Sequence, residues 1–146
     1  MQNRIPPPLL ALVLLLAMWL TAPSHPAPQW SIVLAVGLFI AAGVFGLPAL
    51  HAFRRAGTTI DPVRIGRATS LVTGGVYRFS RNPMYLSLAL LLSAWAMWLG
   101  GAWVWAGPVF LVLWLDQLQI RPEERAMTAR FGEDYLRYRA KVRRWL

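Results

Sequence analysis

The 146-residue chain contains no cysteine, and its only histidines are His25 and His51, which stand apart from each other. A disulfide framework, a thiolate nucleophile and a cysteine-based metal site are therefore excluded within this sequence, and we expect no metal. Charge is also scarce. Charged residues make up 14% of the chain and hydrophobic residues 57%, which leaves too little polar surface to cover a soluble globule.

Acidic residues are few as well, since six Asp and Glu stand against fifteen Lys and Arg, for a net charge of +9. A basic balance of this size can indicate nucleic-acid binding. The positions of the basic residues favour a membrane surface instead, because they lie only at Arg4, in the 51–81 connector and from Arg121 onward. We therefore expect membrane lipids as partners and no nucleic acid.

Apolar residues are gathered into four long runs. Each run approaches the ~20 residues that cross a hydrocarbon core as a helix, and the short ones would tilt or thin the bilayer locally. We therefore predict an all-α integral membrane protein with a single domain over residues 1–146. The predicted transmembrane helices cover residues 8–22, 30–50, 84–99 and 103–118.

The distribution of charge also predicts the topology. Four spans would put the three basic regions on one side of the membrane and the loops 22–29 and 100–102, which lack Lys and Arg, on the other. The positive-inside rule then places both termini in the cytoplasm. Five tryptophans would form an interfacial belt on the opposite side, namely Trp19, Trp30, Trp98, Trp103 and Trp105. Prolines after the first run make a poor signal-peptide cleavage site, so we expect this run to be retained.

Three further segments organise the chain. The connector 56–80 is polar but carries apolar residues, so we expect an ordered cap on the membrane face. Gly100-Gly101 predicts a tight turn that makes the last two spans a hairpin. An interfacial amphipathic helix is predicted near the C-terminus. Its apolar stripe would hold Tyr135, Tyr138, Val142 and Trp145.

A first polar block, Arg81-Asn82-Pro83-Met84-Tyr85, opens the third span. Asn82 is a favoured N-cap and Pro83 a favoured first helical residue. Free backbone N–H groups, the positive end of the helix dipole and the adjacent Arg81 would then attract a carboxylate or a phosphate. Tyr85 lies one turn further and could stack on a ligand. The structural alternative is a capped membrane helix with an arginine that extends to the interface.

A second polar block, Arg121-Pro122-Glu123-Glu124, reads as another helix start. Acidic residues are favoured in a first turn by the helix dipole alone. In a functional interpretation, the two carboxylates stand at the mouth of the hairpin and pair with a cation or accept a hydrogen bond from a ribose. They are two of the six acids in the chain.

Asp116 is an unusual residue for a span, because an ionised acid at mid-membrane costs ~2.5–3.5 kcal/mol on insertion scales. If the helix continues, Asp116, Gln119 and Glu123 share one face. This stripe should face the protein interior. There Asp116 would either pair with an arginine or line a ligand cavity.

Taken in order, the polar blocks resemble the isoprenylcysteine carboxyl methyltransferase family, specifically its small bacterial members, and are similar to the phospholipid N-methyltransferases. The resemblance covers about residues 45–146. It is carried by Ala56-Gly57-Thr58, Leu71-Val72-Thr73-Gly74-Gly75-Val76-Tyr77, Arg81-Asn82-Pro83-Met84-Tyr85, Glu123-Glu124, Phe131-Gly132-Glu133-Asp134-Tyr135, Tyr138 and Val142-Arg143-Arg144-Trp145.

The resemblance implies a bacterial inner-membrane enzyme that uses S-adenosylmethionine, releases S-adenosylhomocysteine and takes its lipophilic acceptor from the bilayer. The family's cofactor contacts fall on Leu71, Val72, Tyr77, Asn82, Pro83, Met84, Tyr85, Glu123 and Glu124, and Arg81 joins them from the first block. A family arginine associated with the acceptor has Arg121 as its nearest counterpart. Many members carry His where Asn82 stands, and Asn cannot titrate near neutral pH. Many members also carry Gly where Ser87 stands, and serine is small enough to keep close packing at this position.

The implied reaction is an in-line displacement at a sulfonium, which needs alignment of the reactants and exclusion of water but no metal. A carboxylate acceptor needs no base. An amine acceptor must lose a proton, and Glu124 and Asp116 are the candidate bases. We hypothesise that Glu123 and Glu124 act mainly in cofactor binding.

Two other functions remain open at this point. Membrane sterol and steroid reductases have a loosely similar C-terminal arrangement and use NADPH, although they are generally longer. A non-enzymatic small membrane subunit would account for the spans and the charges, but not for polar blocks at both ends of the hairpin. The acceptor also stays open among an isoprenoid or prenylated thiol, a phospholipid head group and a small hydrophobic acid.

Overall fold

The computed structural model describes residues 5–25, 27–55 and 70–146. All regular elements in these ranges are helical, which confirms the all-α class. They are α1 (Pro7–Leu20), α2 (Gln29–Arg55), η2 (Gly75–Arg78), α3 (Pro83–Leu99), η3 (Trp103–Trp105), α4 (Ala106–Trp114), η4 (Leu115–Ile120), α5 (Arg121–Phe131) and α6 (Glu133–Lys141). Residues 56–69, where most of the predicted cap falls, lie outside the described residues.

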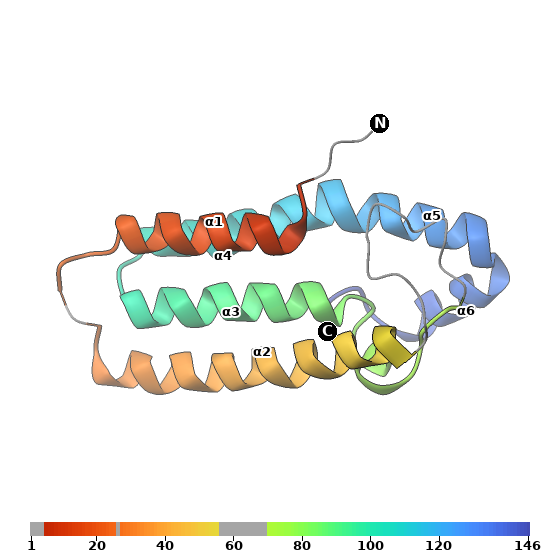
Figure 1. The fold of residues 1–146 in the computed structure, drawn as a ribbon, viewed down its shortest axis with the longest axis horizontal. Helices are drawn as coiled ribbons and strands as arrows, with labels where there is room; N and C mark the ends of the chain where they lie inside the picture. Colours follow the sequence, from red (N-terminus) through yellow and green to blue (C-terminus); the bar gives the residue numbers. More distant parts are fainter. Residues whose placement is uncertain (1–4, 26, 56–69) are drawn as a thin grey trace.

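Helices α1 to α4 run side by side as an elongated bundle, and α5 and α6 extend beyond one end of it (Figure 1). Helix α3 packs against α2 on one side and against α1 and α4 on the other. The contact between α2 and α3 is close because the buried residues of α2 include Ala35, Ala42 and Ala49, one every two turns. Small side chains at this spacing let two helix backbones approach each other.

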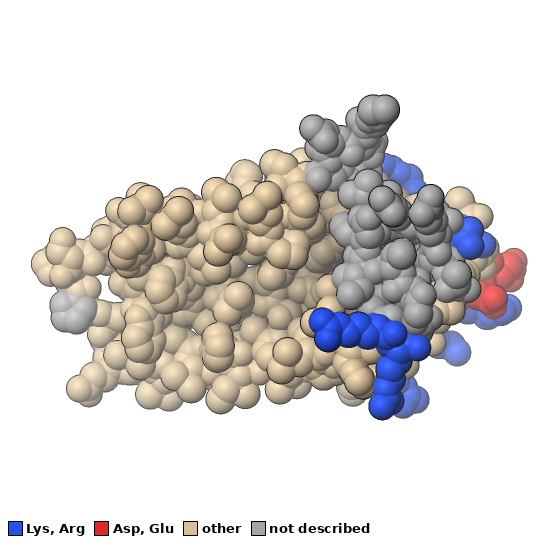
Figure 2. Space-filling model, in the orientation of Figure 1, with Lys and Arg blue, Asp and Glu red and all other residues tan. Residues whose placement is uncertain are grey.

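Two of the four predicted spans are long and apolar enough to cross a membrane. They are Gln29–Ala52 and the continuous helix Trp103–Phe131. The helices α1 and α3 are apolar but shorter, with 14 and 17 residues. Large apolar side chains are exposed along the bundle, for example Phe39 and Leu47 on α2. Figure 2 shows that most of the bundle face in view carries no charged side chain, whereas charged side chains gather toward the end where α2 terminates and α5 and α6 lie.

The turn after α3 agrees with the sequence, because Gly100 and Gly101 have φ of 73° and 87°, values that favour glycine. The predicted helix start at Arg121 coincides with the first residue of α5, but no break in the helix precedes it. Ile120 is already helical, and η4 is a π-helix that leads directly into α5. Pro122 cannot donate to the carbonyl four residues earlier and would clash with it in an α-helix. The wider π turn before Pro122 relieves this conflict without ending the helix.

The C-terminal amphipathic helix is shorter than predicted. Helix α6 ends at Lys141, and Val142 is extended with φ −119° and ψ 131°. The predicted stripe through Val142 and Trp145 is therefore wrong as a single helix. Trp145 instead packs against the core of the bundle, so the last residues return to the bundle as a tail.

Gly132 sets the corner between α5 and α6, with φ 51° and ψ −124°. We expect Gly132→Ala to lower the free energy of unfolding by about 1 kcal/mol, because L residues are strained at positive φ. Strain is the cause, since no heavy atom lies within 4 Å of the added Cβ. Equilibrium unfolding in detergent measures the change. Gly37→Ala in α2 is the control with equally open space and should not destabilise the protein; equal losses in the two variants would contradict the strain argument.

Candidate functional site

A cavity of about 740 Å³ lies where the bundle meets α5 and α6. Its polar lining comes from the segment before α3, the start of α3, and α5 and α6. These residues are Tyr77, Arg81, Asn82, Tyr85, Glu123, Glu124, Tyr135 and Tyr138. Its apolar lining includes Phe39, Leu47, Leu50, Leu88 and Leu91. All the residues predicted to bind a cofactor line this cavity, including Leu71, Val72, Pro83 and Met84.

The start of α3 opens onto the cavity as the sequence predicted, with Asn82 at the N-cap position and Pro83 as the first helical residue. The predicted side-chain cap was wrong, because Asn82 makes no capping hydrogen bond. Its amide Nδ2 instead donates to the carbonyl of Arg144 at 3.0 Å. The first turn of α3 therefore has no side-chain cap, while Met84 and Tyr85 line the cavity.

Glu123 is oriented by two donors on one of its oxygens. Tyr85 Oη and Gln119 Nε2 each lie 2.6 Å from Glu123 Oε1. Gln119 is fully buried, so this arrangement is fixed inside the protein. Gln119 was placed on the face of Glu123 by its spacing, but no ligand role was predicted for it. In the structure it is one of the two residues that orient a cavity-lining carboxylate.

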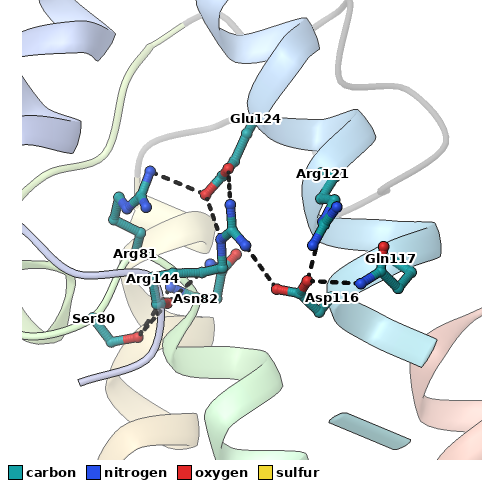
Figure 3. Close-up of polar contacts among 8 residues, drawn as sticks. All are labelled: Ser80, Arg81, Asn82, Asp116, Gln117, Arg121, Glu124 and Arg144. Atoms are coloured by element: carbon teal, nitrogen blue, oxygen red, sulfur yellow. Dashed lines mark hydrogen bonds and ion pairs between the residues drawn. The ribbon is translucent and has the colours of Figure 1, made fainter. Parts of the chain in front are cut away.

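Glu124 lies between two arginines (Figure 3). Arg144 donates to it twice, from Nε to Oε1 at 3.1 Å and from Nη2 to Oε2 at 2.7 Å. Arg81 Nη1 lies 3.0 Å from Oε1. The side chains of Arg81 and Glu124 are both only 9% exposed, so this group of charges is largely removed from water.

Asp116 and Arg121, predicted with Glu124 as catalytic residues, are not among the residues that line the cavity. Arg121 Nε lies 3.1 Å from Asp116 Oδ2, and Arg144 Nη1 lies 2.8 Å from Asp116 Oδ1. Asp116 thus pairs with arginines, which was the structural alternative for this residue. Asp116 lies in the π-helix η4, and its partner Arg121 is five residues ahead, the spacing that a π-helix brings together.

Arg144 is the residue that sequence reasoning missed. The C-terminal tail that carries Arg144 crosses the residues just before α3. There Arg81 N donates to the carbonyl of Arg143 at 3.0 Å, and Ser80 Oγ donates to the carbonyl of Arg144 at 3.4 Å. The hydrogen bonds to Glu124 raise the pKa of the Arg144 guanidinium, which stays charged. Its only sequence signal was a position in the last resembling block, Val142-Arg143-Arg144-Trp145.

Three tyrosines complete the polar end of the cavity. Tyr138 Oη donates to the carbonyl of Tyr77 at 2.7 Å, which ties α6 to the segment before α3. Burial, the largest cause, raises the pKa of Tyr77, Tyr135 and Tyr138 above the ordinary value. These hydroxyls stay protonated at physiological pH, so each offers a hydrogen-bond donor and no negative charge. In the described part of the chain, no group of three or more His, Asp or Glu side chains could hold a metal ion.

Comparison with known proteins supports the phospholipid methyltransferase part of the resemblance seen in the sequence. Residues 30–134 match the phospholipid methyltransferase family. An uncharacterized protein of Haemophilus influenzae is 49% identical over 63 residues, which cover 43% of this chain and all of that protein. No solved structure matches the chain. The family match covers well over half of the chain and includes both polar blocks, so the chain belongs to the phospholipid methyltransferase family.

Proposed function

We propose that this protein transfers a methyl group from S-adenosylmethionine to a lipophilic acceptor at the cytoplasmic face of a membrane. The observation that carries the proposal is a cavity that combines a polar end with apolar walls. Membership of the phospholipid methyltransferase family supports both the donor and a lipid acceptor. The cavity volume of about 740 Å³ falls in the range of ligand sites, ~300–1,000 Å³.

The proposal includes four transmembrane helices, α1 to α4, with both termini in the cytoplasm. It is supported by the apolar side chains exposed along the bundle and by the charged side chains at one end (Figure 2). The short helices α1 and α3 would be accommodated by local thinning of the bilayer. Pro6, before α1, and Tyr138, in α6, both line the cavity, so α1 begins at the end of the bundle where α6 lies. A bacterial inner membrane is the proposed location.

The polar end of the cavity fits the amino-acid part of S-adenosylmethionine. Arg81 offers two buried N–H groups, Nε and Nη1, that make no hydrogen bond with the described residues; Nη1 has an ion-pair distance to Glu124 but not the angle of a hydrogen bond. Such groups, beside an uncapped helix start, suit a carboxylate. Glu123 would accept from a ribose hydroxyl or an ammonium group, and Leu71 and Val72 would contact apolar parts of the nucleoside.

When bound, S-adenosylmethionine would supply an electrophilic methyl group. The chain contributes alignment and a site with apolar walls that excludes water. Glu124 and Asp116, the candidate bases for an amine acceptor, both accept hydrogen bonds from Arg144. We therefore propose that they hold the geometry of the site, with Arg121 fixed on Asp116 outside the cavity. Leu47, Leu88 and Leu91 would contact the lipophilic acceptor.

Calorimetric titration of the detergent-purified protein with S-adenosylmethionine, and separately with NADPH, tests the proposal. We expect S-adenosylmethionine to bind in the micromolar range and Glu123→Gln to weaken it about tenfold, the effect of one charge-assisted hydrogen bond. Glu133→Gln is the matched control, since that side chain is 88% exposed on α6. Binding of NADPH alone would establish a reductase instead, and binding of neither by the folded protein would favour a non-enzymatic subunit.

A further inference from the structure

We propose that Arg144 is a positioning residue, which occupies Glu124 so that the buried guanidinium of Arg81 stays available to an anionic group in the cavity. The inference rests on the proposed function, because the anionic group would be the carboxylate of S-adenosylmethionine. The C-terminal tail after α6 would then support ligand binding, although none of its residues is among those that line the cavity.

Two arginines compete for the carboxylate of Glu124. Arg144 takes both oxygens of Glu124 in a fork, with N···O distances of 3.1 and 2.7 Å. Arg81 has one contact with this carboxylate, from Nη1 to Oε1 at 3.0 Å. Forked pairs between arginine and a carboxylate are the stronger geometry. Arg144 therefore holds the position that Arg81 would otherwise occupy.

Because Arg144 holds both oxygens of Glu124, the N–H groups of Arg81 are not all bound by this carboxylate. Arg81 lines the cavity and its side chain is 9% exposed, yet Nε has no hydrogen-bond partner among the described residues and Nη1 has only its ion-pair contact with Glu124. Unsatisfied buried donors are costly and bind an acceptor strongly when one arrives. Without Arg144, Glu124 would be free to form a fork with Arg81, and those donors would be consumed inside the protein.

Arg144 is itself held in place by Asp116 and Asn82. Its Nη1 donates to Asp116 at 2.8 Å, and its carbonyl accepts from Asn82 Nδ2 at 3.0 Å (Figure 3). Asp116 therefore keeps the guanidinium between α5 and the start of α3. Holding Arg144 explains why an apolar helix carries Asp116, a carboxylate that does not line the cavity.

The test compares the affinity for S-adenosylmethionine, measured by calorimetry on the full chain in detergent, among variants of the tail. We expect Arg144→Ala to weaken binding about tenfold, and Arg144→Lys to weaken it less, since an ammonium keeps the charge but cannot form the fork. Arg143→Ala is the matched control, because it removes the same charge from the adjacent, exposed side chain and keeps the backbone carbonyl. It should bind like the unmodified protein.

A double variant separates positioning from simple support of the fold. In a Glu124→Gln background, no carboxylate remains to capture Arg81, so adding Arg144→Ala should change the affinity less than about twofold. A tenfold loss in both backgrounds would overturn the inference and assign Arg144 a merely structural role. An unaltered affinity in Arg144→Lys would overturn the inference as well. This second test remains valid if Arg144→Ala fails to fold. Failure of the unmodified protein to bind S-adenosylmethionine would overturn the proposed function itself, and the inference with it.

Discussion

Replacing Glu124 with alanine is expected to lower the free energy of unfolding by about 3 kcal/mol, the scale for removing one partner from a buried ion pair. Glu124 is the carboxylate shared by Arg81 and Arg144. Without it, Arg81 keeps a charge in a position where its side chain is only 9% exposed. Arg144 loses less, because its side chain is 28% exposed and still contacts Asp116.

Equilibrium unfolding in mixed micelles, followed by tryptophan fluorescence, measures this loss without any ligand. Glu133→Ala provides the control, since the Glu133 carboxylate lies 4.0 Å from Arg137 and its side chain is 88% exposed. Exposed pairs of this kind contribute little, so the control should stay within ~0.5 kcal/mol of the unmodified protein. Equal unfolding curves for the two variants would show that the Glu124 network does not hold α5 and the tail together.

The adjacent acids Glu123 and Glu124 have different tasks for a geometric reason. Successive residues of a helix point ~100° apart, so Glu123 meets Tyr85 while Glu124 meets Arg81 and Arg144. The sequence predicted that this pair stands at the mouth of the hairpin formed by the last two spans. It could not assign the two carboxylates, because their partners come from other parts of the chain.

Local signals were sufficient for several parts of the fold. Runs of apolar residues located the four helices of the bundle, and Pro83 located the start of α3 because its fixed φ suits a first helical position. Gly100-Gly101 located the turn between α3 and η3 because both residues adopt positive φ. In each case the physical cause lies within a few residues of the signal, which is why one sequence is enough.

Contacts between distant residues were not predictable in the same way. The side chain of Asn82 does not cap α3 but donates a hydrogen bond to a carbonyl 62 residues later in the chain. The hydrogen bonds of Arg144 reach Glu124 and Asp116, 20 and 28 residues earlier. Nothing in the local pattern of a basic C-terminus distinguishes Arg144 from Arg143. The π-helix before Pro122 was also missed, because a proline in a polar block reads as a helix start when the preceding turn is assumed to be regular.

Gly46 is the position where the packing of α2 on α3 should be least tolerant, and we expect Gly46→Val to lower the free energy of unfolding by about 3 kcal/mol. A Cβ at Gly46 would meet Ser87 Oγ at a forbidden distance and Ser87 Cβ at 3.0 Å. Ser87 Oγ cannot simply rotate away without loss, because it donates to the carbonyl of Ala42 at 2.8 Å. The added side chain therefore breaks a hydrogen bond and separates the two helices.

Two variants make the Gly46 prediction specific to this contact. Gly43→Val makes the same change one turn earlier in α2, where no heavy atom lies within 4 Å of the added Cβ, so its effect should stay below ~1 kcal/mol. Ser87→Gly removes the side chain that the valine meets, and in this background Gly46→Val should cost at least ~1 kcal/mol less, as expected for directly contacting residues. If Gly46→Val costs the same with Ser87 and with glycine at that position, the close approach of α2 and α3 is not limited by Ser87. Because both Gly46 and Ser87 line the cavity, the same contact also sets how near the apolar wall of the site stands to its polar end.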